Sequence, residues 1–106
     1  MAPLVRLVKV NGLQYNRNRD PQAYRRAPGV PFRIQALIEG RGDARVVLTA
    51  EDGTVLAEGT VAAPAAWTHE LTYSEPGSRL LRLEASRGAD RYGIDLRLDV
   101  VAPEHA

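Results

Sequence analysis

Apolar and polar residues alternate with a period of two along most of this chain. The pattern is clearest in residues 92–100, where a glycine, an aspartate or an arginine separates successive large apolar residues. A strand with this alternation has one face on a core and the other in water. Residues 79–87 repeat the pattern, and residues 88–90 supply a turn between the two strands.

Turn-forming residues divide the rest of the chain into further strands. Asp52-Gly53 is a strong hairpin signal, Glu75-Pro76-Gly77 fits a type II turn, residues 40–43 form another turn, and residues 62–66 form a loop broken by Pro64. The strands between these signals are expected at residues 4–10, 31–39, 45–51, 54–61 and 67–74. Seven strands without a credible helix predict an all-β fold, a seven-stranded immunoglobulin-like antiparallel β-sandwich.

One apolar face of these strands supplies the expected core. With 106 residues, 44% of them hydrophobic, the chain is long enough for one domain with a core that needs no disulfide. We expect this domain to span residues 1–103, with a tail at residues 104–106. The expected core residues are Phe32, Ile34, Ile38, Val46, Leu48, Trp67, Leu71, Leu81, Leu83, Ile94, Leu96 and Leu98.

The composition of the chain disfavours some classes of partner but does not determine the cellular compartment. The formal net charge is +1, which provides no overall field for binding nucleic acid or acidic membranes. The chain has no Cys, and no stretch is long and apolar enough to span a membrane. The first ten residues do not resemble a signal peptide. We therefore expect either a cytoplasmic protein or an excised domain of an exported one.

Three stretches resemble the middle of bacterial immunoglobulin-like modules of the E-set type. They are GVPFRIQALIEG, VVLTAEDGTVLAEGTV and EPGSRLLRLEAS, and the resemblance covers residues 28–101. In those modules a Gly-Pro precedes the second strand, a charged hairpin follows the third, and a Pro-Gly turn precedes the sixth. The chain lacks the Cys pair of antibody domains, and Phe32 and Leu81 stand near the positions where fibronectin type III domains carry Trp and Tyr. The resemblance implies the superfamily and its sandwich fold.

Residues 11–30, called the 11–30 loop below, follow neither a strand nor a helix period. A short extra strand at residues 13–16 or a helical turn at residues 21–25 would shorten this connection. Long loops in compact domains are often functional, and Arg and Tyr are enriched where proteins bind one another. The alternative is a connector whose Tyr rings pack on the end of the sandwich. The candidate partner-binding residues are Tyr15, Arg17, Arg19, Tyr24, Arg25 and Arg26.

No residues converge on catalysis, a cofactor or a metal site. His69 lies beside Trp67 on an apolar face, where a histidine at the core margin is expected, and His105 is one residue from the C-terminus. The sequence has no nucleophile elbow, HExxH motif, phosphate-binding glycine loop, or zinc- or calcium-ligand spacing. Residues 41–43 spell the Arg-Gly-Asp tripeptide of integrin-binding loops, a triplet that a chain rich in Arg and Gly also produces by chance.

We therefore expect a non-catalytic binding, assembly or spacer module whose partner is another protein or a neighbouring domain. No membrane insertion and no cofactor is expected. A carbohydrate-binding β-sandwich is the alternative, although Tyr15 and Tyr24 would make a thin aromatic platform. Nucleic-acid binding and a role as an enzyme accessory domain are less favoured alternatives, and domains that bind nucleic acid are usually strongly basic. Edge strands also offer a route to a homo-oligomer.

Overall fold

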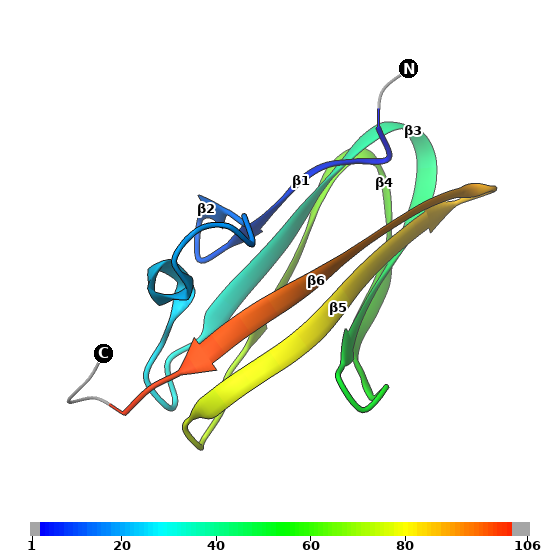
Figure 1. The fold of residues 1–106 in the computed structure, drawn as a ribbon. Helices are drawn as coiled ribbons and strands as arrows, with labels where there is room; N and C mark the ends of the chain where they lie inside the picture. The colour runs from blue at the N-terminus through cyan, green and yellow to red at the C-terminus, as the bar shows by residue number, and fades with distance from the viewer. Residues whose placement is uncertain (1–2, 103–106) are drawn as a thin grey trace.

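The computed structural model describes residues 3–102, and in them the chain is almost entirely β-strand (Figure 1). A single 3₁₀ turn, η1 (Pro21–Tyr24), is the only helical element in this part of the chain. The strands are β1 (Val5–Val10), β2 (Leu13–Gln14), β3 (Phe32–Ala50), β4 (Val55–Leu71), β5 (Gly77–Arg87) and β6 (Asp90–Val100).

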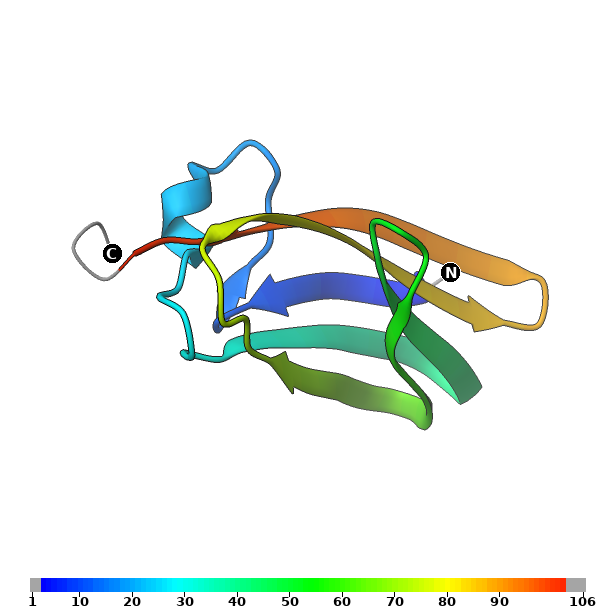
Figure 2. The ribbon, with the colours of Figure 1, turned by 90° about the horizontal axis from the view of Figure 1, so that it is seen from below.

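All six strands belong to one antiparallel sheet with the order β2-β1-β3-β5-β6, and β4 pairs with β3 outside this path. The long strand β3 joins two regions of the sheet. Its first half pairs with β1 and with the second half of β4, whereas its second half pairs with β5 and with the first half of β4. The sheet consequently curls into a half-barrel (Figures 1 and 2). Apolar side chains from its strands form one core cluster. The prediction of an all-β, antiparallel fold is confirmed. Within residues 3–102 the strands form one curled sheet and not the two packed sheets of a sandwich.

Two connections that the sequence predicts are replaced by bends inside continuous strands. The prediction of a turn at residues 40–43 is wrong. β3 continues through these residues, and the β3–β4 register shifts between Ile38 and Gly42. The loop expected at residues 62–66 is also wrong, because β4 continues through Pro64. The proline is tolerated since β4 pairs only with β3 and its other edge has no strand beside it in the described chain.

The bend in β3 depends on glycines and on one arginine. Gly40 and Gly42 have φ values of 87° and 90°, a region that residues with a Cβ rarely occupy. Arg87, at the end of β5, donates a hydrogen bond of 2.6 Å from Nη1 to the carbonyl oxygen of Glu39. The sharp local bend is thus formed by backbone freedom and held by a side chain from a distant strand.

The core lies on the concave side of the curled sheet and matches the apolar faces that the alternation predicts. All the predicted core residues are buried except Leu71 and Ile94, which are half-buried and pack against the core. The sequence pattern missed the contribution of β1, which charged residues interrupt, and that of Tyr24 in the 11–30 loop. The additional buried residues are Leu4, Val5, Val8, Val10, Tyr24, Ala36, Ala44, Ala85 and Val100.

The 11–30 loop lies at one end of the half-barrel. The 11–30 loop contains β2 and η1, so both short elements anticipated within it are present. It lies where β6 ends, at the opposite end of the molecule from the β5–β6 turn (Figure 2). The tail expected at residues 104–106 and His105 lie outside the described residues. No helix within residues 3–102 has the length and apolar character needed to cross a membrane.

Candidate partner-binding surface

Asn11 fixes the start of the 11–30 loop against β3. Its side chain donates from Nδ2 to the carbonyl oxygen of Tyr24 (2.9 Å) and accepts from the backbone N–H of Arg33 at Oδ1 (3.0 Å). Its own N–H donates to the carbonyl oxygen of Arg33 (2.8 Å). Asn11 has a φ of 55°, a left-handed conformation that asparagine tolerates better than most residues. The loop therefore begins at a defined position.

Tyr24 holds the middle of the loop to the core. Only 1% of this residue is exposed, and its ring centroid lies 5.1 Å from that of Tyr15. Its hydroxyl donates to the carbonyl oxygen of Gln14 (2.8 Å) and accepts from the N–H of Asn16 (3.0 Å). A buried tyrosine normally needs such partners for its hydroxyl group. Tyr24 was predicted to bind a partner, but its burial leaves it almost no surface, and it acts on the loop from inside.

The loop also covers part of the outer edge of β6. Arg97 donates its backbone N–H to the Tyr15 hydroxyl (3.0 Å), and Arg26 donates its N–H to the carbonyl oxygen of Asp99 (3.1 Å). Val101 donates its N–H to the carbonyl oxygen of Arg26 (3.0 Å), and Arg26 forms a parallel bridge with Val100. Exposed strand edges favour pairing with other chains, so these bonds protect the C-terminal half of β6.

The four arginines of the predicted site fall into two pairs. Arg25 and Arg26 are half-buried, and the Arg26 guanidinium bonds the carbonyl oxygen of Arg25 (3.1 Å). Arg17 and Arg19 are exposed and form no ion pair within residues 3–102. The Arg19 guanidinium carbon lies 6.0 Å from the centroid of the Tyr24 ring. Arg17 and Arg19 are therefore the members of the predicted set that can meet an external anionic group.

Two shallow hollows meet at Tyr15 and Arg17. The first, about 170 Å³, lies between the loop and Arg97 of β6. The second, about 240 Å³, adds Arg82 of β5 and residues 93–95 of β6. Arg82 pairs with Asp95 (2.9 Å) and Arg97 with Asp99 (3.0 Å). The hydrogen bond to Asp95 raises the pKa of Arg82, and desolvation only partly opposes this effect.

Sequence reasoning did not associate Arg82 and Arg97 with the loop. The hairpin register of β5 and β6, which places Arg82 opposite Asp95, follows from the short turn between them. That the loop folds over β6 does not follow from any local pattern, since Tyr15 and Arg97 are 82 residues apart in sequence. Long-range contacts of this kind leave no signal in the alternation of apolar and polar residues.

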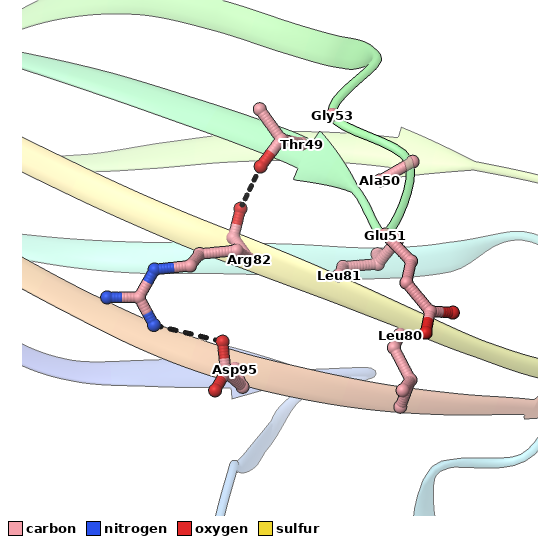
Figure 3. Close-up of a pocket in the computed structure, with 8 residues that line it drawn as sticks. All are labelled: Thr49, Ala50, Glu51, Gly53, Leu80, Leu81, Arg82 and Asp95. Atoms are coloured by element: carbon pink, nitrogen blue, oxygen red, sulfur yellow. Dashed lines mark hydrogen bonds and ion pairs between the residues drawn. The ribbon is translucent and has the colours of Figure 1, made fainter.

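A larger hollow, about 470 Å³, lies at the tip of the β3–β4 hairpin where β5 and β6 pass beside it (Figure 3). Leu80, 47% exposed, forms an apolar part of its wall. Thr49 donates from Oγ1 to the carbonyl oxygen of Arg82 (3.4 Å), and the guanidinium of the same arginine donates to Asp95 (Figure 3). Thr49, Arg82 and Asp95 are thus engaged with one another, and Glu51 also lies in the wall of the hollow.

The remaining candidates for chemistry lie apart from the loop. His69 is half-buried, and its ring stacks on Trp67 with centroids 6.0 Å apart, as expected for the core margin. Residues 41–43 are exposed on the bend of β3. Within residues 3–102, no three His, Asp or Glu side chains gather in a way that could hold a metal ion.

Comparison with known proteins adds no relative to these observations. No family model matches the chain, and no curated protein sequence matches it. The function is therefore inferred from the surface that the loop and β6 form together.

Proposed function

We propose that this domain is a non-catalytic binding or assembly module that captures another protein through the 11–30 loop. The supporting observation is that a firmly attached loop presents Arg17 and Arg19 without an acidic partner in the described chain. Arginine forms strong, directional hydrogen bonds with carboxylates. A preformed loop also loses less conformational entropy on binding than a mobile one. The partner should therefore carry Asp or Glu side chains.

The immunoglobulin-like assignment is part of the same proposal. The seven stretches with strand patterns are all extended, and β3 and β4 each contain two of them on either side of a bend. We infer that the curled sheet is related to such a sandwich by the joining of two pairs of consecutive strands end to end. Modules of that superfamily serve as binding, assembly or spacer domains, and this one belongs to a larger protein or complex.

A protein partner is favoured over nucleic acid and carbohydrate. The net charge is +1, whereas domains that bind nucleic acid are usually strongly basic. Sugar-binding platforms need exposed rings, but Tyr24 is buried and the Tyr15 ring packs beside it with its hydroxyl bonded to the β6 backbone. A surface of mixed charge, with two arginines that have no acidic partner within residues 3–102, matches a partly acidic protein segment better.

A peptide-display selection tests this proposal without a known partner. Random peptides are selected on the immobilised domain, and the dissociation constants of the enriched sequences are measured by fluorescence anisotropy. Acid-rich peptides are expected. Replacing both Arg17 and Arg19 by Ala should weaken their binding by about tenfold, as two exposed charge contacts warrant. The control is Arg33→Ala with Arg41→Ala, which removes the same charge from exposed positions on β3.

Three outcomes would overturn the proposal. One is the absence of acidic residues from the selected peptides. Another is equal binding by the Arg17/Arg19 variant and the Arg33/Arg41 control. The third is tighter binding of a single-stranded DNA oligonucleotide or of an oligosaccharide from a glycan array than of any selected peptide. The melting temperatures of both variants should match that of the parent protein, because none of these four side chains is buried.

A further inference from the structure

The protective cover over β6 extends along only half of the strand. Arg97, Asp99 and Val101 direct backbone groups to the loop, which establishes that odd-numbered residues of β6 point away from β5. The β5–β6 pairing continues to Asp90 without a register shift. By the same alternation, Arg91, Gly93 and Asp95 direct their N–H and C=O groups to the open edge. Within residues 3–102 those groups have no hydrogen-bond partner.

The side chains on the concave face of β6 differ in the same way. In the covered half, Leu96, Leu98 and Val100 are 1%, 0% and 3% exposed. In the uncovered half, Tyr92 and Ile94 are only half-buried, although they alternate in phase with the others and pack against the same core. An additional strand beside residues 91–95 would cover both of them. The missing burial and the missing hydrogen bonds thus coincide on one stretch.

The outer face of residues 91–95 presents arginines that an added strand could contact. The hollow of about 240 Å³ lies there, with Arg17 and Arg82 in its wall beside Gly93, which exposes backbone and no side chain. Arg82 is engaged by Asp95, whereas Arg17 has no acidic partner in the described chain. Arg91 bonds only backbone carbonyl oxygens, those of Gly88 and Asp90. Arg17 and Arg91 are therefore available to carboxylates on an added strand.

We propose that residues 91–95 of β6 bind an extended segment of the partner as an additional β-strand. Its apolar residues would face Tyr92 and Ile94, and its alternate, acidic residues would face Arg17 and Arg91. Strand addition of this kind derives affinity from backbone hydrogen bonds and specificity from alternate side chains. The inference rests on the proposed function, and it adds the conformation of the ligand and a second part of the site.

The other open edge, along β4, suits such a segment less well. Pro64 interrupts its backbone donors, and proline on an edge strand is a common guard against pairing. Glu70 is exposed on β4 and forms no ion pair within residues 3–102, so an acidic strand would meet a like charge there. β4 therefore provides an internal comparison for the β6 edge.

The test uses Gly93, whose N–H points to the open edge. Gly93→Pro removes that N–H without removing a bond to β5. Gly93→Ala is the matched control, because a Cβ at this position also displaces the Arg82 guanidinium but leaves the N–H in place. With an acidic peptide chosen by display, we expect Gly93→Pro to bind about five- to tenfold more weakly than Gly93→Ala. The proline removes one backbone hydrogen bond to the peptide, and its ring occupies space at the strand edge.

Amide hydrogen exchange of the unmodified protein provides a second measurement that does not depend on a proline variant folding. Saturating peptide should slow exchange at Arg91, Gly93 and Asp95 and leave the amides of β4 unchanged. The strand inference is wrong if these amides stay unprotected and the two Gly93 variants bind the peptide equally. If peptide binding still depends on Arg17 and Arg19 in that case, the loop proposal stands. Protection of the same amides by protein concentration alone, with a dimer in sedimentation, would assign the edge to a second copy and overturn the inference.

Discussion

At the scale of single residues, Tyr24 shows how burial decides between recognition and support. Tyrosine beside arginine is the composition of many binding surfaces, and the sequence offers no means to distinguish a ring that faces solvent from one that faces a core. Here the ring fills the end of the core and the hydroxyl satisfies two backbone groups of the loop. The proposed recognition surface therefore consists of Arg17 and Arg19, which lie on the loop that the buried ring attaches to the core.

Tyr24→Phe should destabilise the domain by about 1–2 kcal/mol, because Gln14 and Asn16 each lose a hydrogen-bond partner while the ring remains. Tyr15→Phe is the comparison: the Tyr15 hydroxyl accepts one bond, from the Arg97 N–H, and the loss of this bond should cost about 0.5–1 kcal/mol. Urea unfolding followed by Trp67 fluorescence measures both. Equal stability of Tyr24→Phe and the parent protein would show that the hydroxyl does not hold the loop.

At the scale of elements, the strand pattern located nearly every extended segment but not the way consecutive segments join. Gly40, Gly42 and Pro64 are turn-forming residues in most contexts, so turns were the reasonable expectation. The continuous strands arise because β3 and β4 pair with each other on both sides of the bends, which adds hydrogen bonds that two separate hairpins would lack. Local propensity predicts that the chain bends at these residues, and tertiary pairing determines that the strand continues.

The bend at Gly40 yields a test of this view. Gly40→Ala places a Cβ at positive φ and within 2.7 Å of the Arg87 guanidinium, which must then release the Glu39 carbonyl. Gly42→Ala causes the same backbone strain, but its Cβ would lie 3.8 Å from Arg87 Cδ, an ordinary van der Waals contact. We expect losses of about 2–3 and about 1–2 kcal/mol in the free energy of unfolding, respectively. An equal loss in both variants would mean that Arg87 contributes nothing to the bend.

The β3–β4 hairpin was predicted from Asp52-Gly53, and it also makes stability depend on pH. The side chain of Asp52 accepts a hydrogen bond from the Thr54 N–H (2.9 Å), and bonds to Thr54 lower the pKa of Asp52 below 3.8. Because the folded pKa is lower than the unfolded one, this contribution is complete above about pH 4 and is lost as pH falls through the folded pKa. In Asp52→Asn the amide oxygen can still accept, so the urea midpoint should fall less between pH 5 and pH 2.5 than in the parent protein. Identical pH profiles would exclude the contribution of Asp52.

At the scale of the whole molecule, the 11–30 loop determines which parts of the half-barrel are closed. The sequence predicts the strands, most of the core and the arginines of the loop, since these depend on local pattern and composition. It does not predict that the loop folds over β6, because Tyr15 and Arg26 meet residues more than seventy positions away. Arg82, Gly93 and Arg91 therefore enter the candidate site only through the three-dimensional arrangement.

The unequal cover along β6 should be measurable in the free protein by amide hydrogen exchange. Arg97 and Val101 donate to loop acceptors, whereas Arg91, Gly93 and Asp95 face the open edge. We expect exchange on the order of 100-fold slower at the first two, which is a local opening free energy of about 3 kcal/mol. Tyr15→Phe should remove the protection of Arg97 and leave that of Val101, whose acceptor is the carbonyl oxygen of Arg26. Uniform exchange along β6 in the parent protein would contradict both the loop's covering role and the open edge on which strand addition depends.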